Sequence, residues 1–407
     1  MRRLVTAIAL GFGLSGAMTP MAFAEPPAAP GFDGKTIKLG VVGPLSGAVA
    51  SVGTPVVAGN QVWFRKLNDR GGIAGRYKVE LVIEDHTNVP SQAVQRYAKI
   101  KDNVVLFAQM FGTPTTSAVQ PQLKTDNIVL APTSFDNLWV RDPHLLPVGS
   151  TYQIMAANAF DYYLRMEAKP TTKLCTMIQD NPYGDAGKEG ISLALEKSSR
   201  KLTQTVSFAL TDQDFTAPIS QLQNAGCEFV FVTAVPGQLA RIAANAARVT
   251  FTPRWIAQWP SWHSVLIKNP AIDYIEKYVW LAGEGPEWGD EDVPGMHELL
   301  TDLRKYKPDQ QPDIWFTYGY NQARAVTALL EKAVANNDLS REGIVKALDQ
   351  MPNVNFGGLT GPHVYGSIAK RELPRATSVF AIDRNKPFGL KALATNVESA
   401  AAKAFKY

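Results

Sequence analysis

Residues 104–118 read Val-Val-Leu-Phe-Ala-Gln-Met-Phe-Gly-Thr-Pro-Thr-Thr-Ser-Ala. The apolar run that ends at Phe111 has the composition of a buried β-strand. Gly112 permits a sharp turn, Thr113 is a natural N-cap, and Pro114 suits the first position of a helix. Free backbone N–H groups and threonine hydroxyls would then point out of the carboxyl end of a strand, where they attract an anion such as a carboxylate. The alternative is that Thr113 only caps the helix.

The same alternation of strand and helix extends in both directions. It predicts strands at 37–43, 79–84, 104–111 and 128–132, with helices at 58–68, 91–101 and 114–125. A second alternation of similar size predicts helices at 154–165, 184–199, 217–224 and 238–248, with strands at 174–179, 205–209, 229–233 and 254–257. Because strands that alternate with helices form parallel sheets covered on both faces, we expect an α/β chain with two doubly wound, Rossmann-like lobes.

The last third of the chain has too few strands for a third domain. Strands are predicted at 278–282 and 378–382, with helices at 293–305, 315–336 and 341–350 between them. We therefore expect these elements to be additions to the first two lobes. Two open parallel sheets joined without a long linker create a cleft, and ligands of such sheets bind beyond the carboxyl ends of the strands. The groove between the lobes is the expected ligand site.

Residues 1–24 have the features of a cleavable secretory signal peptide. Arg2 and Arg3 form a positive start, residues 4–18 are apolar and rich in glycine, and Ala22-Phe23-Ala24 fits a cleavage site. No cysteine lies at that site, so we expect no lipid anchor. No later segment has eighteen uninterrupted apolar residues. The sequence therefore predicts an exported protein.

Charge and motifs argue against several functions. The net charge of +4 falls to +2 without residues 1–24, which hold two arginines and no acid, so no nucleic-acid partner is expected. The sequence has no GxGxxG, Walker A or GxSxG pattern and no closely spaced histidine pair. Glu84-Asp85-His86 is interpreted as a solvated strand end. We predict no catalytic residues, no metal and no cofactor, and hence not an enzyme.

The two cysteines lie in apolar segments that are predicted to be core strands. Cys175 is inside one of these segments and Cys227 opens another. An exported chain permits a disulfide. Because bridge geometry is demanding between core strands, the interpretation favoured here is two buried free thiols.

Several motifs in a fixed order carry a resemblance over more than 300 residues. The motifs are Ile-Lys-Leu-Gly-Val-Val-Gly-Pro-Leu-Ser-Gly at 37–47, Asn-Asp-Arg-Gly-Gly-Ile-Ala-Gly at 68–75, Asn-Pro-Tyr-Gly at 181–184, Asp-Phe at 214–215 and Cys-Glu-Phe-Val at 227–230. With them the chain resembles the periplasmic leucine/isoleucine/valine-binding-protein family of ABC-transporter receptors, which have the type I periplasmic binding fold.

The resemblance implies a receptor of two lobes that closes on a small solute and docks to an ABC permease in the inner membrane. It implies a three-strand hinge with crossings near 149–151, 282–283 and 359–362. The N-terminal lobe would comprise 36–149 plus 283–360, and the C-terminal lobe 150–282 plus 361–407. We expect a monomer.

The resemblance also implies which residues bind the ligand. The family holds the ligand carboxylate after the third and fourth strands of the first lobe, covers the ligand with a Tyr-Gly pair, and adds residues from later loops. Tyr152, at a helix start after the first crossing, fits ligand contact and hinge packing equally well. The predicted ligand-binding residues are Gly112, Thr113, Ser134, Phe135, Tyr152, Tyr183, Val235, Gln258 and Trp259.

Departures from the family pattern predict the class of ligand. The family's ammonium-binding acid falls after the 254–257 strand, where this chain has Gln-Trp-Pro-Ser-Trp at 258–262 and no carboxylate until Asp273. A buried ammonium without a counter-charge is costly. We therefore expect a carboxylate, an amide or an aromatic acid without a charged amine, with Phe135 and Trp259 placed to stack on a ring. A branched-chain amino acid binder, a periplasmic sensor of the same fold and an exported α/β enzyme are the alternatives.

Overall fold

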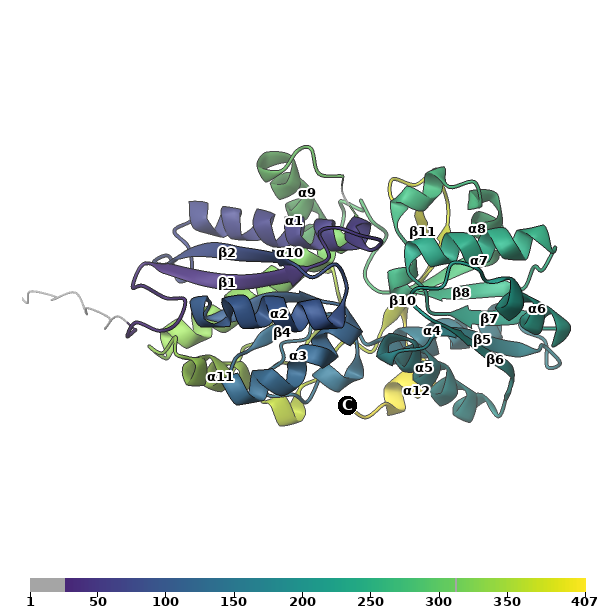
Figure 1. Ribbon diagram of the computed structural model, residues 1–407, viewed down its shortest axis with the longest axis horizontal. Coiled ribbons are helices and arrows are strands. Elements are labelled where there is room, and N and C mark those ends of the chain that lie inside the picture. Colours follow the sequence, from purple (N-terminus) through teal and green to yellow (C-terminus); the bar gives the residue numbers. More distant parts are fainter. Residues whose placement is uncertain (1–25, 312) are drawn as a thin grey trace, which may run out of the picture.

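The computed structural model describes residues 26–311 and 313–407. Figure 1 shows two lobes side by side along the long axis of the molecule, each with a sheet between helices. The two sheets have four and seven strands, which confirms the prediction of two α/β lobes. The signal peptide predicted at 1–24 lies outside the described residues.

The first lobe is built on a parallel four-stranded sheet in the order β2-β1-β3-β4. Its strands are β1 (Thr36–Gly43), β2 (Lys78–Asp85), β3 (Leu106–Phe111) and β4 (Leu130–Thr133). Every residue of β3 and β4 is buried, as expected for a sheet covered on both faces. Its helices are α1 (Ala50–Asp69), α2 (Pro90–Ile100), α3 (Thr113–Asp126), α9 (Pro294–Tyr306), α10 (Ile314–Ala335) and α11 (Arg341–Asp349).

Helix α1 begins at Ala50, eight residues before the predicted start at 58. Its first turns contain Gly53 and Pro55. Glycine and proline have low helix propensity, so the sequence did not predict this part of the helix. The helix packs closely on α10. A Cβ atom on Gly59 would lie 2.2 Å from the Phe316 carbonyl oxygen, and one on Gly319 would lie 2.0 Å from the Val56 carbonyl oxygen. The two glycines therefore permit the close approach that fixes α10 against the first lobe.

The second lobe is built on a seven-stranded sheet in the order β11-β10-β9-β8-β7-β5-β6. Its strands are β5 (Leu174–Gln179), β6 (Leu202–Phe208), β7 (Phe229–Val232), β8 (Arg254–Gln258), β9 (Val279–Gly283), β10 (Thr377–Ile382) and β11 (Leu390–Val397). Its helices are α4 (Tyr152–Met166), α5 (Pro182–Ser198), α6 (Thr216–Asn224), α7 (Pro236–Arg248), α8 (Ile272–Tyr278) and α12 (Ala400–Ala404).

The sheet of the second lobe is parallel, as predicted, except at one edge. Strand β10 runs antiparallel to both β9 and β11. Strand β11 was not predicted, because exposed polar residues such as Lys391, Thr395 and Asn396 interrupt its apolar pattern. Strand β11 pairs with β10 as a hairpin and is the edge strand of the sheet. One face of such an edge strand can meet solvent, which accounts for its exposed polar residues.

The prediction of two free thiols is also wrong. Cys175 and Cys227 form a disulfide with Cα atoms 5.9 Å apart. Cys175 lies in β5, and Cys227 lies two residues before β7, which pairs with β5 in parallel. This strand order brings the two cysteines to neighbouring positions, which their separation of 52 residues does not reveal.

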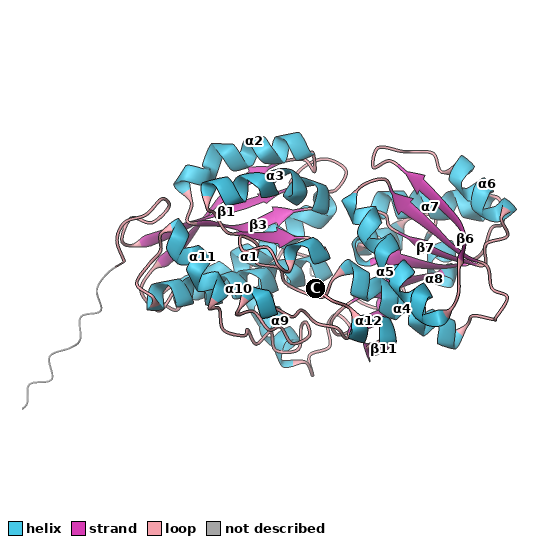
Figure 2. Cartoon of the chain, turned by 90° about the horizontal axis from the view of Figure 1, so that it is seen from below, coloured by secondary structure: helices cyan, strands magenta, loops and turns pink. Residues whose placement is uncertain are grey.

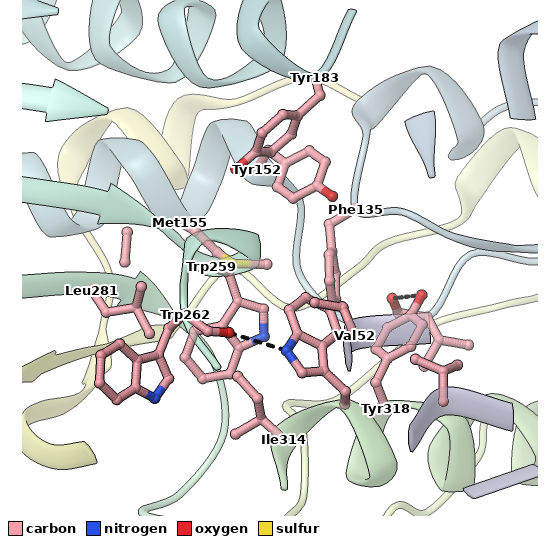
Figure 3. Close-up of a cluster of buried hydrophobic side chains, with 14 of the residues drawn as sticks. Val52, Phe135, Tyr152, Met155, Tyr183, Trp259, Trp262, Leu281, Ile314 and Tyr318 are labelled. Atoms are coloured by element: carbon pink, nitrogen blue, oxygen red, sulfur yellow. Dashed lines mark hydrogen bonds between the residues drawn. The ribbon is translucent and has the colours of Figure 1, made fainter. Parts of the chain in front are cut away.

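A single cluster of buried apolar side chains extends through both lobes. Figure 3 shows its middle, where Val52, Phe135 and Tyr318 of the first lobe lie near Tyr152, Tyr183 and Trp259 of the second. The lobes therefore meet through apolar side chains. Within the described part of the chain, no helix is both long enough and apolar enough to span a membrane.

Candidate ligand-binding site

Figure 2 shows the two lobes side by side. Residues of both lobes line one pocket between them. It encloses about 540 Å³ of space free of protein atoms, including the part that is open to solvent. The ends of strands, the loops that follow them and the first turns of helices in both lobes contribute its wall. The lining residues are Val49, Val52, Asn88, Phe111, Gly112, Thr113, Pro114, Thr133, Tyr152, Gln179, Asn181, Tyr183, Leu210, Val235, Pro260 and Trp315.

The turn between β3 and α3 lines this pocket with Gly112, Thr113 and Pro114. Gly112 has φ 97° and is itself the N-cap, so the helix begins at Thr113. The prediction of Thr113 as N-cap is therefore wrong by one position. The side chain that bonds this turn is that of Thr115, whose hydroxyl donates to the Phe111 and Gly112 carbonyl oxygens. The first N–H groups of any helix lack intrahelical acceptors and favour a negatively charged or polar oxygen.

Thr113 is freed from capping and bonds across the sheet instead. Its Oγ1 lies 2.6 Å from Ser134 Oγ, just beyond β4. The indole N–H of Trp139 donates to the same serine oxygen at 3.1 Å. Ser134 is fully buried behind the pocket wall, whereas Thr113 lines the pocket. Ser134 therefore orients the Thr113 hydroxyl.

Aromatic rings connect the lobes beside the pocket. The Tyr152 and Tyr183 rings meet edge to face at 5.1 Å, and Phe135 packs on Tyr152 at 5.5 Å and on Tyr318 at 4.6 Å (Figure 3). The Tyr183 hydroxyl donates to the Ala234 carbonyl oxygen at 3.2 Å. Burial raises the pKa of both Tyr152 and Tyr183 above the ordinary value, so both phenols are neutral.

Amide side chains line the side of the pocket that belongs to the second lobe. Gln179 Nε2 donates to Gln238 Oε1 at 2.5 Å, and Asn181 Nδ2 donates to Gln179 Oε1 at 2.9 Å. The Asn181 side chain also accepts the N–H groups at the start of α5. The sixteen lining residues, all within the described chain, include no charged side chain. Nothing in the pocket wall offers a counter-charge to an ammonium group.

The pocket brings together five of the nine predicted site residues: Gly112, Thr113, Tyr152, Tyr183 and Val235. Ser134 and Phe135 lie directly behind them. Gln258 and Trp259 do not line this pocket. Gln258 is fully buried, and neither of its amide atoms has a hydrogen-bond partner among the described residues. Trp259 packs on Phe380 at 5.5 Å. A role for these two residues in binding stays a prediction.

Sequence reasoning missed other lining residues, notably Val49, Leu210, Pro260 and Trp315. Leu210 and Pro260 follow β6 and β8, so the rule that loops after parallel strands form the site would have indicated them. Trp315 had no such signal. It lies at the start of a helix in a late segment that returns to the first lobe.

Trp259 lines a second pocket, which holds about 420 Å³ of space free of protein atoms, including the part that is open to solvent. The other lining residues are Val148, Glu284, Pro286, Trp288, Met296, Ile314, Thr317, Tyr318, Asn321 and Leu359. Glu284 Oε2 accepts from the Ser150 N–H at 2.7 Å and from the Thr360 hydroxyl at 3.0 Å. Burial raises the pKa of this carboxyl to about 7.

His363 makes a similar connection. Its Nε2 accepts the Gly149 N–H at 2.8 Å, so Nδ1 bears the hydrogen and donates to the Gly361 carbonyl oxygen at 2.8 Å. Burial lowers the pKa of His363 to about 3, so the ring is neutral. Glu284 and His363 thus tie together segments near residues 149, 284 and 361. Within residues 26–311 and 313–407, no group of three or more His, Cys, Asp or Glu side chains could hold a metal ion.

Comparison with known proteins agrees with this architecture. A profile described as periplasmic binding protein matches residues 36–387. A curated relative, Leu/Ile/Val-binding protein homolog 6 of Brucella abortus (strain 2308), is 24% identical over 204 residues, which are 48% of this chain and 50% of that protein. The chain thus spans about half the length of curated relatives such as this one.

Two solved structures share the fold. The fatty acid ABC transporter substrate-binding protein from Thermomonospora curvata is 25% identical with a TM-score of 0.86, over 93% of this chain and 97% of that chain. A branched chain amino acid ABC transporter protein from Thermus thermophilus with bound valine is 17% identical with a TM-score of 0.78, over 91% of this chain and 98% of that chain. From this profile, these neighbours and the two facing lobes, we conclude that the chain belongs to the periplasmic binding protein family.

Proposed function

We propose that the protein is the periplasmic solute receptor of an ABC transporter. It binds a small carboxylate, amide or aromatic acid that has no charged amine, in the pocket between its lobes. The observation on which this rests is the pocket wall, which includes Thr113 at the start of α3 but no charged side chain. Export follows from the signal peptide predicted at 1–24, and an inner-membrane permease is the partner of the receptor.

The chemistry of the wall supports this class of ligand. A carboxylate or amide oxygen is stabilised by the first turn of α3 and by the Thr113 hydroxyl, which Ser134 orients. An α-ammonium group would be buried without a counter-charge. Val49, Leu210 and Val235 provide an apolar surface for the rest of the ligand.

Relatives support a receptor but differ in their ligands. The neighbour from Thermomonospora curvata is named a fatty acid ABC transporter substrate-binding protein, and it is 25% identical to this chain. The relative from Pseudomonas aeruginosa is named a leucine-, isoleucine-, valine-, threonine- and alanine-binding protein. A carboxylate is common to both kinds of ligand, whereas an ammonium group occurs only in the second.

Binding by lobe closure follows from the position of the pocket. A ligand that contacts both walls favours the closed form by the difference between its affinities for the two forms. Residues of the first lobe such as Thr113 hold its polar end, and Tyr183 and Val235 approach from the second lobe.

Two ligands of nearly the same shape test the proposal. Leucine and 4-methylpentanoate share a carbon skeleton and a carboxylate, and only leucine has the ammonium group. We expect isothermal titration calorimetry to detect 4-methylpentanoate and to give a much weaker signal with leucine. A thermal-shift screen that adds 4-methylpentanamide and phenylacetate separates the carboxylate, amide and aromatic possibilities, since a ligand at 100 times its Kd adds about 2.7 kcal/mol of stability. Tighter binding of leucine than of 4-methylpentanoate would contradict the proposal.

A further inference from the structure

One tryptophan side chain both lines the ligand pocket and bonds the opposite lobe. Trp315 is the second residue of α10, which packs on α1 in the first lobe. Its indole Nε1 donates to the main-chain oxygen of Trp262 at 3.1 Å, and Trp262 follows β8 in the second lobe. The Trp315 side chain is almost fully buried and forms part of the pocket wall. Figure 3 shows this bond as a dashed line to Trp262.

A second contact between the lobes lies beside it. Asp313 caps α10 by accepting the Phe316 N–H at 2.6 Å, and its other carboxylate oxygen lies 3.3 Å from His263 Nε2. His263 Nδ1 accepts the Val265 N–H at 3.0 Å, which places the ring hydrogen on Nε2, toward Asp313. The start of α10 is held to the segment after β8 at two adjacent points.

We propose that Trp315 couples occupancy of the ligand pocket to closure of the lobes. This inference rests on the proposed function, because it assigns the closing contact of that same pocket. When the lobes separate, the Trp315–Trp262 hydrogen bond breaks and the indole becomes exposed to solvent. A ligand beside the indole restricts its rotamers to the one that reaches the second lobe. The Trp315 side chain then loses less conformational entropy when the cross-lobe bond forms, so a bound ligand favours the closed form.

The chain contains a matched control for this bond. The Trp262 indole Nε1 donates to the Phe388 carbonyl oxygen at 3.1 Å, and both of these residues lie in the second lobe. The group of Trp262 that accepts from Trp315 is its main-chain oxygen, which every substitution retains. Trp262→Phe therefore removes an indole hydrogen bond of equal length from the same cluster and leaves the cross-lobe bond in place. Trp315→Phe removes the cross-lobe bond and keeps an aromatic ring in the pocket wall.

The two variants are compared in the dissociation rate of 4-methylpentanoate, measured by stopped-flow fluorescence. We expect Trp315→Phe to dissociate about fivefold faster, the change that corresponds to one typical hydrogen bond, with little change in the association rate. Trp262→Phe is expected to lower the melting temperature and to leave the dissociation rate near that of the unmodified protein. Equal dissociation rates in the two variants would overturn the inference.

A second measurement needs no ligand and separates this inference from the proposed function. Small-angle X-ray scattering reports the radius of gyration, which rises when the lobes separate. In ligand-free protein we expect a larger radius for Trp315→Phe than for Trp262→Phe. If 4-methylpentanoate does not bind the unmodified protein, the proposed function fails, and the scattering comparison alone decides this inference. An unchanged radius in Trp315→Phe would then reject it.

Discussion

The Thr113 hydroxyl lies 2.6 Å from the Ser134 hydroxyl, so two strand ends of the first lobe share one hydrogen bond at the pocket wall. Thr113→Val keeps the shape of the side chain and removes that bond together with a hydrogen-bonding group of the site. We expect 4-methylpentanoate to bind about tenfold more weakly, as measured by isothermal titration calorimetry, since a hydrogen bond to a charged group is worth about 1.5 kcal/mol or more.

Thr125→Val is the matched control for this prediction. Thr125 lies at the far end of the same helix and donates to the Pro121 carbonyl oxygen, away from the pocket. The affinity of the Thr125→Val variant for 4-methylpentanoate should equal that of the unmodified protein. Equal losses in the two threonine variants would mean that the effect acts through the helix and not through the site.

Tyr183→Ala tests the wall that the second lobe provides. The ring packs on Tyr152 at 5.1 Å, and its hydroxyl donates to the Ala234 carbonyl oxygen. Truncation removes an aromatic surface that both lobes share, so we expect at least a tenfold loss of affinity in the same titration. Tyr183→Phe loses only the hydroxyl, which bonds within its own lobe, and should retain most of the affinity. An unchanged affinity in Tyr183→Ala would remove this residue from the site.

The disulfide between Cys175 and Cys227 is expected to stabilise the second lobe. A bridge that closes a loop of 52 residues contributes about 4 kcal/mol in the chain-entropy description, and measured values are usually about 2–4 kcal/mol. The double variant Cys175→Ser, Cys227→Ser should lower the free energy of unfolding in urea by that amount. Reduction of the unmodified protein with dithiothreitol is the control and should give the same midpoint. A midpoint equal to that of the oxidised protein would contradict the prediction.

The sequence predicted the architecture well where local signals and the fold agree. Strand β5 was predicted with its observed bounds, because an apolar run between turn residues fits only a central strand. The turn at Gly112 was predicted for the same local reason, whereas the cap itself moved by one residue. The disulfide was not, because it depends on β5 and β7 being neighbours in the sheet, and strand order is a property of the whole lobe.

The candidate site was predicted in part for a related reason. Thr113 and Tyr183 follow strands of the two facing sheets, so a rule about strand ends finds them. Trp315 begins a helix whose place is fixed by the contact of Gly59 and Gly319 with the facing helix, more than 250 residues apart in the chain. No pattern near residue 315 indicates which end of that helix faces the pocket.

Glu284 is expected to make stability depend on pH in a direction opposite to that of most carboxylates. Burial raises its pKa from 4.5 to about 7, so between these values the folded protein binds a proton that the unfolded chain does not. The contribution of the Glu284 carboxyl to the free energy of unfolding is fully present below pH 4.5. It declines as the pH rises to about 7 and is lost above that pH. The decline amounts to about 3 kcal/mol. Glu284→Gln keeps an oxygen that accepts from Ser150 and Thr360 and has no proton to lose.

The measurement is the free energy of unfolding in urea at pH 5, 6, 7 and 8 for the unmodified protein and for Glu284→Gln. We expect the variant to gain stability relative to the unmodified protein as pH rises across this range. Glu287→Gln is the control. Burial opposes ionisation of Glu287, but Lys386 and the Ala392 N–H outweigh it and hold its pKa below the ordinary value, so its contribution changes only under more acidic conditions. Parallel curves for Glu284→Gln and the unmodified protein would show that the carboxyl is ionised in the fold throughout, and that the three segments near residues 149, 284 and 360 are held by a charge.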